Sequence, residues 1–127
     1  MRLKSEIFAS ALIRNVFARG DFAAIERKGA AEGGAVFVRQ SFRDGTETLY
    51  APAPQSFFDD VDTGKRLFEL RLYRQSRDSV SEALGREVRF DPDLWIVALG
   101  ADEIGDLIEL GQEGRERNDP LDSLFRR

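Results

Sequence analysis

Five aspartates could supply a metal site. They fall in two groups, one in the segment "FFDDVDTG" and the other on either side of Pro92: Asp59, Asp60 and Asp62, then Asp91 and Asp93. Divalent cations such as Mg²⁺ prefer several carboxylate oxygens, and such a site would support phosphoester hydrolysis. Each group also has a structural interpretation, as a polar loop and as a helix stop before proline. A carboxylate-dependent, divalent-metal hydrolase is therefore the alternative function.

Most other common catalytic residues and motifs are missing from the sequence. The 127 residues contain neither His nor Cys, which excludes thiolate chemistry, the Ser-His-Asp triad and Cys- or His-ligated metals. The glycine-rich stretch "GAAEGG" lacks the Lys and the following helix of a phosphate-binding loop. These absences favour a non-enzymatic binding or accessory module without a cofactor, and they leave catalysis by carboxylates open.

A basic strand face is the first candidate binding surface. Residues 66–74 alternate between apolar and polar types, which is the period of a half-buried strand. The alternation predicts Phe68, Leu70 and Leu72 on the core side and Glu69, Arg71 and Tyr73 on the other. Arginine binds phosphate or carboxylate through paired hydrogen bonds, and the alternative is an ordinary solvated face. The arginines expected on this surface are Arg66, Arg71, Arg74 and Arg77, joined by Arg39 and Arg43.

A proline-rich stretch, "LYAPAPQS", is the second candidate. Tyr50, Gln55 and Ser56 stand beside two prolines, which makes a stiff segment with exposed hydrogen-bonding groups. A stiff loop loses little entropy on binding, whereas the structural alternative is a rigid end to a strand. The predicted binding site therefore combines two sets of side chains: Arg71, Tyr73 and Arg74 from the strand, and Tyr50, Gln55 and Ser56 from the loop.

The charge balance limits the class of partner. Lys and Arg number 19 against 23 Asp and Glu, so the net charge is −4. An acidic protein is poorly suited to nucleic acid, whose binding depends on neutralising phosphates. We expect a protein or a small anionic ligand instead. No stretch has the roughly 18 continuous apolar residues of a membrane span, so we expect a cytoplasmic protein with no membrane partner.

Hydrophobic periodicity predicts two helices and five or six strands. The first helix covers residues 5–19 with Ser5 as its N-cap, and the second covers residues 80–89 with Ser79 and Glu82 as a capping box. Residues 106–110 form either a last strand, in a hairpin with the strand before it, or a short helix. The other strands are expected at residues 22–28, 35–42, 47–51, 66–74 and 94–99.

These elements predict an α+β fold. We expect a five- or six-stranded, mostly antiparallel sheet with both helices packed on one face. The first two strands should pair across "GAAEGG", and the next two across Asp44-Gly45. Residues 94–99 are apolar on both sides and should form a central strand. One domain is expected over residues 1–110, followed by a charged tail over residues 111–127.

Several stretches together resemble a family of small bacterial proteins known as domain of unknown function 1491. They are "KSEIFASALIR", "GAVFV", "DGTETLYAPAPQS", "RLFE" and "REVRFDPDLWIV", in that order. The resemblance covers approximately residues 1–99, and "YAPAPQS" and "FDPDLW" are its most specific parts. It implies one small cytoplasmic domain, and it brings no activity, substrate or cofactor.

Overall fold

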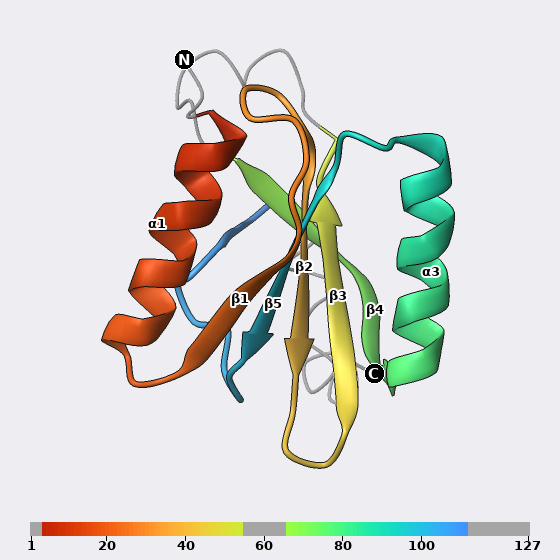
Figure 1. Cartoon of the computed structure of the whole chain (residues 1–127). Coiled ribbons are helices and arrows are strands. Elements are labelled where there is room, and N and C mark those ends of the chain that lie inside the picture. Colours follow the sequence, from red (N-terminus) through yellow and green to blue (C-terminus); the bar gives the residue numbers. More distant parts are fainter. Residues whose placement is uncertain (1–3, 55–65, 112–127) are drawn as a thin grey trace.

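Six strands form one mixed sheet in the order β1-β5-β2-β3-β4-β6. The computed structural model describes residues 4–54 and 66–111. Figure 1 shows the sheet between two helices, α1 (Ser5–Ala18) and α3 (Arg77–Phe90). The strands are β1 (Phe22–Arg27), β2 (Val36–Ser41), β3 (Thr46–Pro52), β4 (Leu67–Ser76), β5 (Trp95–Gly100) and β6 (Glu109–Leu110).

The sheet confirms the predicted α+β class. Strand pairs β1–β5, β2–β3 and β3–β4 are antiparallel, and β2–β5 and β4–β6 are parallel. The predicted hairpin across Asp44-Gly45 joins β2 to β3. The predicted pairing of β1 with β2 is wrong, because β5 lies between them. A strand that is apolar on both faces gains most from an interior position, where neighbours and helices cover it.

The two helices pack on opposite faces of the sheet, so the expectation that both cover one face is wrong. Alternate residues of β2 and β5 point to different cores. Val38 and Val97 pack in the α1-side core with Leu12, whereas Phe37 and Ile96 pack in the α3-side core. Because the central strands are apolar on both sides, each face needs its own helix to exclude water.

Strand β4 is irregular, which changes the face of one predicted core residue. In its register with β3, Tyr50 is opposite Leu70 and Leu49 is opposite Leu72, so Arg71 is an extra residue. Such a bulge breaks strict alternation. Phe68 and Leu70 share one face, as predicted, and pack on the α1 side, but Leu72 packs on the α3 side.

Both helices begin differently from the prediction. The N-cap of α3 is Ser76, whose hydroxyl accepts a hydrogen bond from the backbone N–H of Ser79 at 3.1 Å. The helix therefore begins at Arg77, three residues before the predicted start. Ser5 is not a cap, since Lys4 takes the N-cap position of α1. The Ser5 hydroxyl is buried and donates to the carbonyl of Gly34.

The last strand pairs at the far edge of the sheet. β6 lies parallel to β4, so a strand forms near residues 106–110, but the expected hairpin with β5 is wrong. Ile104, Leu107 and Ile108 pack in the α1-side core, which draws this segment across that face. The predicted tail lies outside the described residues apart from Gly111, whose N–H donates to the carbonyl of Phe68.

Neither helix has the length and apolar character needed to cross a bilayer; this holds for the residues that the structure describes. Each of the two contains 14 residues, about 21 Å of helix at 1.5 Å per residue. The hydrocarbon core of a bilayer is about 30 Å thick.

Candidate binding site

The predicted basic surface is divided among local ion pairs. Arg71 donates to Glu87 of α3 and to Glu69, both at 3.2 Å. Arg74 lies over the ring of Phe42 at 3.7 Å and pairs with Asp44 at 3.3 Å. Tyr73, by contrast, is 41% exposed. The two arginines are therefore held by groups of the protein itself.

The proline-rich stretch contributes less surface than expected. Tyr50 is buried at 3% exposure, and its hydroxyl donates to the side-chain oxygen of Gln40 at 3.4 Å. The expectation that Tyr50 presents an exposed group is wrong, because β3 is an interior strand and the ring fills the α1-side core. Gln55 and Ser56 lie outside the described residues.

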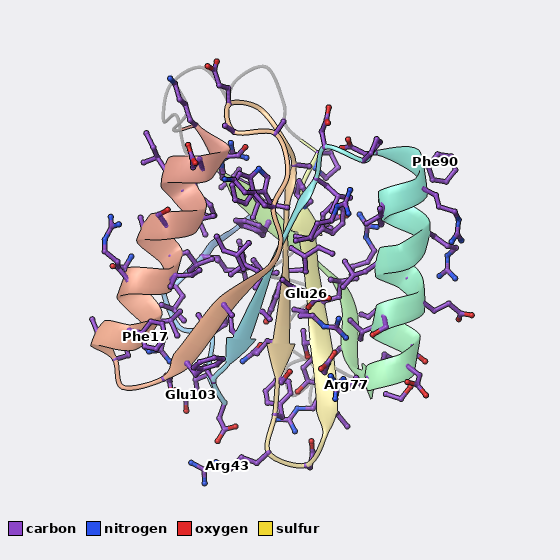
Figure 2. All side chains as sticks on the ribbon, viewed as in Figure 1. Phe17, Glu26, Arg43, Arg77, Phe90 and Glu103 are labelled. Atoms are coloured by element: carbon purple, nitrogen blue, oxygen red, sulfur yellow. The ribbon has the colours of Figure 1, made fainter. Side chains whose placement is uncertain are left out.

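The other arginines do not extend a basic face. Arg66 is buried on the α1 side, where it donates to Ser5 at 2.8 Å and lies over the ring of Phe8. Arg43 projects from the β2–β3 hairpin, is 93% exposed and pairs with Asp102 at 3.1 Å (Figure 2). Arg39 is buried beneath α3. The tertiary structure thus sends these residues to both faces and one end of the sheet.

The aspartates beside Pro92 form a turn. The carboxylate of Asp91 accepts from the backbone N–H of Asp93 at 3.1 Å, immediately after α3 ends. This geometry supports the helix-stop interpretation. Asp59, Asp60 and Asp62 lie outside the described residues. Within residues 4–54 and 66–111, no three acidic side chains gather as a metal site would require.

A polar cavity of about 480 Å³ lies between the sheet and the beginning of α3. It is close to the carboxyl ends of the parallel strands β2 and β5, which are common places for ligand sites in open sheets. Its lining comes from four strands, the β2–β3 turn and α3: Glu26, Arg39, Ser41, Gly45, Glu47, Arg77, Ser81 and Ala98.

Arg39 forms the floor of this cavity. Its Nε and Nη2 atoms donate to Glu47 Oε1 at 3.0 and 2.6 Å. Nη1 donates to both oxygens of Glu26, at 3.2 and 3.0 Å, and Nη2 also reaches the Ser81 hydroxyl at 2.8 Å. Every guanidinium nitrogen therefore has a partner. The network joins β1, β2, β3 and α3, and it fixes the shape of the cavity.

The β2–β3 turn beside the cavity is organised by Asp44. Its carboxylate accepts from the hydroxyl of Thr46 at 2.7 Å and from the backbone N–H of Thr46 at 2.9 Å. The hydroxyl bond is the largest cause that lowers the pKa of Asp44, followed by the backbone bond, with a further contribution from the positive charge of Arg74. Gly45 follows with φ +89, which glycine adopts readily.

A second, smaller cavity of about 290 Å³ lies at the same end of the sheet. It shares Ser41 with the first, and the ion-paired residues Arg43 and Asp102 are part of its lining. Polar groups from both cavities therefore gather where β2 and β5 end.

Sequence reasoning missed the network at the cavity floor, although one signal for it exists. Arg39 directly follows the apolar run "VFV" within one strand, and Glu47 follows eight residues later across the Asp-Gly turn. A charged residue inside a buried strand requires a partner, and the hairpin supplies one. Glu26 and Ser81 carry no comparable signal, because only the tertiary structure brings β1 and α3 to this point.

A comparison of the chain with protein-family models agrees with the resemblance found in the sequence. A family model described as "Protein of unknown function (DUF1491)" matches residues 3–109. The chain belongs to the DUF1491 family. No curated protein matches this DUF1491 chain.

Solved structures show the same fold. The chain is similar to protein Atu0922 from A. tumefaciens, with 57% identity and a TM-score of 0.78 over 87% of this chain and 95% of that one. It is also similar to a DUF1491 family protein from Caulobacter crescentus, whose crystal structure matches with 27% identity and a TM-score of 0.71 over 88% of this chain and 100% of that one. These similarities show that the chain shares its fold with both proteins.

Proposed function

We propose that the protein is a non-enzymatic binding module whose ligand occupies the cavity between the sheet and α3. The observation that carries this proposal is the cavity itself, about 480 Å³ with a buried, fully hydrogen-bonded arginine at its floor. Cavities of roughly 300–1,000 Å³ are typical of small-molecule sites. Burying charges carries a large desolvation cost, and a fixed polar floor is the kind of pre-organisation that binding sites use.

A small ligand suits this geometry better than a surface-bound macromolecule. Arg71, Tyr73 and Arg74 remain a weaker candidate surface, since a partner would have to displace the carboxylates that already hold both arginines. Within the cavity, Ser41 donates to Glu47 at 2.9 Å and Ser81 accepts from Arg39. These polar groups mainly hold one another in place, which supports recognition over proton transfer.

A cavity-filling substitution tests the proposal. Ser81→Phe places a large side chain in the cavity, and Glu82→Phe, at the neighbouring exposed position of α3, is the matched control. The measurement is an NMR amide titration with phosphate, citrate, sugar phosphates, nucleoside monophosphates and amino acids. We expect at least one probe to shift the amides of Ser41, Arg77 and Ser81 in the wild type and in the control.

The same shifts should be absent in the cavity-filled variant. If no probe shifts these amides in the wild type, or if Ser81→Phe binds as well as Glu82→Phe, the cavity is not the binding site.

A further inference from the structure

We infer that the cavity takes a small zwitterion, a molecule with a carboxylate at one end and an ammonium group at the other, as in an amino acid. This inference rests on the proposed function, because it assumes binding in this cavity, and it adds the chemical class of the ligand. It follows from which polar groups of the lining are already used and which are not.

The charges that line the cavity cancel. Arg39 and Arg77 carry two positive charges, and Glu26 and Glu47 carry two negative charges. An anion such as phosphate would be attracted by Arg77 but repelled by both glutamates. A simple cation would be attracted by the glutamates but repelled by the arginines. A ligand with no net charge and two opposite ends avoids both penalties, since each end can face the group of opposite sign.

The groups at the floor are occupied by one another. Each nitrogen of Arg39 donates to a glutamate, and one of them also donates to Ser81. Glu47 accepts from Arg39 on Oε1 and from Ser41 on Oε2. A ligand that used these atoms would break a buried ion pair. The floor therefore supports the site without holding the ligand's charged ends.

The available groups lie on two different walls. The side chain of Arg77, at the first turn of α3, has no hydrogen bond or ion pair to any residue in the described ranges, so its guanidinium donors are available. The Glu26 side chain on β1 is 40% exposed and accepts only from Arg39 Nη1 among the same residues. A carboxylate can accept about four hydrogen bonds. Figure 2 shows both residues on the side of the sheet that α3 covers.

Each wall matches one end of a zwitterion. Arg77 can bind a carboxylate with two parallel hydrogen bonds, and the helix N-terminus adds positive potential there. Ser81, one turn further along α3, accepts from Arg39 and retains its own hydrogen for a ligand oxygen. On β1, Glu26 can accept from an ammonium group. The ligand thus spans the cavity from α3 to β1.

An NMR titration with a length series tests the inference. The probes are glycine, β-alanine, γ-aminobutyrate, 5-aminovalerate and L-glutamate, with acetate, phosphate and methylammonium as singly functional comparisons. We expect at least one amino acid to shift the Glu26, Arg77 and Ser81 amides with a Kd at least tenfold lower than that of acetate, phosphate or methylammonium.

Neutral substitutions identify the two anchors. Arg77→Gln and Glu26→Gln should each weaken binding of that amino acid at least tenfold. Arg86→Gln and Glu82→Gln change an exposed ion pair elsewhere on α3 and should leave the Kd within twofold. Circular dichroism of each variant verifies that the fold is retained.

Two results would overturn the inference and leave the proposed function standing. One is tight binding of phosphate or acetate that is insensitive to Glu26→Gln. The other is binding of a different probe class in the cavity while the amino acids cause no shift. If no probe of either panel shifts the cavity amides, the proposed function and this inference both fail.

Discussion

Arg39 shows how one side chain can set the geometry of a whole site. It is only 7% exposed, and it hydrogen-bonds to β1, β3 and α3 at once. In such a network, removing one charge is more costly than replacing the pair, because the remaining charge stays buried without compensation. The stability of the α3-side face should therefore depend strongly on this residue.

We predict that Arg39→Leu lowers the free energy of unfolding by about 3–5 kcal/mol, because Glu47 is left buried without its cation. Urea denaturation followed by circular dichroism measures this difference. The control Arg43→Leu, at a 93% exposed side chain, should cost less than about 0.5 kcal/mol. Adding Glu47→Leu to Arg39→Leu should restore part of the loss. Equal losses of stability in Arg39→Leu and Arg43→Leu would show that the buried network around Arg39 does not stabilise the fold.

Asp44 should make the β2–β3 turn sensitive to acid. Its pKa is lowered in the folded protein, chiefly by the Thr46 hydroxyl. The ionised carboxylate therefore stabilises the fold fully above its unfolded pKa, near 3.8, and this contribution is lost as the pH falls through the lower, folded value. We expect Tm of the wild type to exceed that of Asp44→Asn at pH 7, and the gap to narrow below about pH 4.

Thr46→Val supplies the comparison for this pH dependence. It removes the hydroxyl donor to Asp44 and keeps the backbone bond. In the Thr46→Val background, the Tm difference caused by Asp44→Asn should change less with pH. A difference that is the same at pH 3 and pH 7 in the wild-type background would show that the carboxylate charge does not stabilise the turn.

At the scale of elements, the connection between β1 and β2 explains how β5 fits between them. The loop containing Gly29 and Gly34 packs directly against the backbone of Asp93 and Leu94, the two residues before β5. Ala30 donates its N–H to the carbonyl of Asp93 at 2.9 Å. Trp95 Nε1 donates to the carbonyl of Ala30 at 2.7 Å. The glycines are needed because the two backbones approach too closely for a side chain.

We predict that Gly34→Ala lowers the free energy of unfolding by about 3 kcal/mol or more, because the new Cβ would overlap the carbonyl oxygen of Asp93. The adjacent control Gly33→Ala has open space around its Cβ position and should be close to neutral. Thermal and urea unfolding of the two variants give the comparison. Equal stability of the two would show that the loop can shift away from β5 without cost.

At the scale of the whole molecule, the two cores share their central strands. β2 and β5 each contribute residues to both faces of the sheet. Loss of either strand would therefore expose both cores at once. Trp95 lies in the α1-side core at 1% exposure, so its fluorescence reports on one face, while helical circular dichroism reports on both helices.

We predict a single cooperative unfolding transition, with coincident midpoints for Trp95 fluorescence and for circular dichroism at about 222 nm. Shared strands make independent loss of one face unfavourable. Urea titrations with both probes on one sample measure this. Two separated midpoints would show that α3 and its core unfold apart from the α1 side.

The sequence by itself determined the local features of this protein. The two helices, the strands and the Asp-Gly hairpin follow from periodicity and turn chemistry, which depend on neighbouring residues. The sequence contains no His and no Cys, which directly limits the chemistry available to the protein's side chains. The family resemblance, carried by short stretches such as "FDPDLW", is confirmed by the match over residues 3–109.

Only the tertiary structure decided which distant residues meet. The insertion of β5 between β1 and β2 places Glu26 beside Arg39, and the position of α3 brings Ser81 and Arg77 to the same cavity. The helix on each face, the parallel pairing of β6 and the burial of Tyr50 also depend on long-range packing. Local patterns specify which residues are apolar or charged, whereas the choice of partner is made by the arrangement that buries both faces of the sheet together.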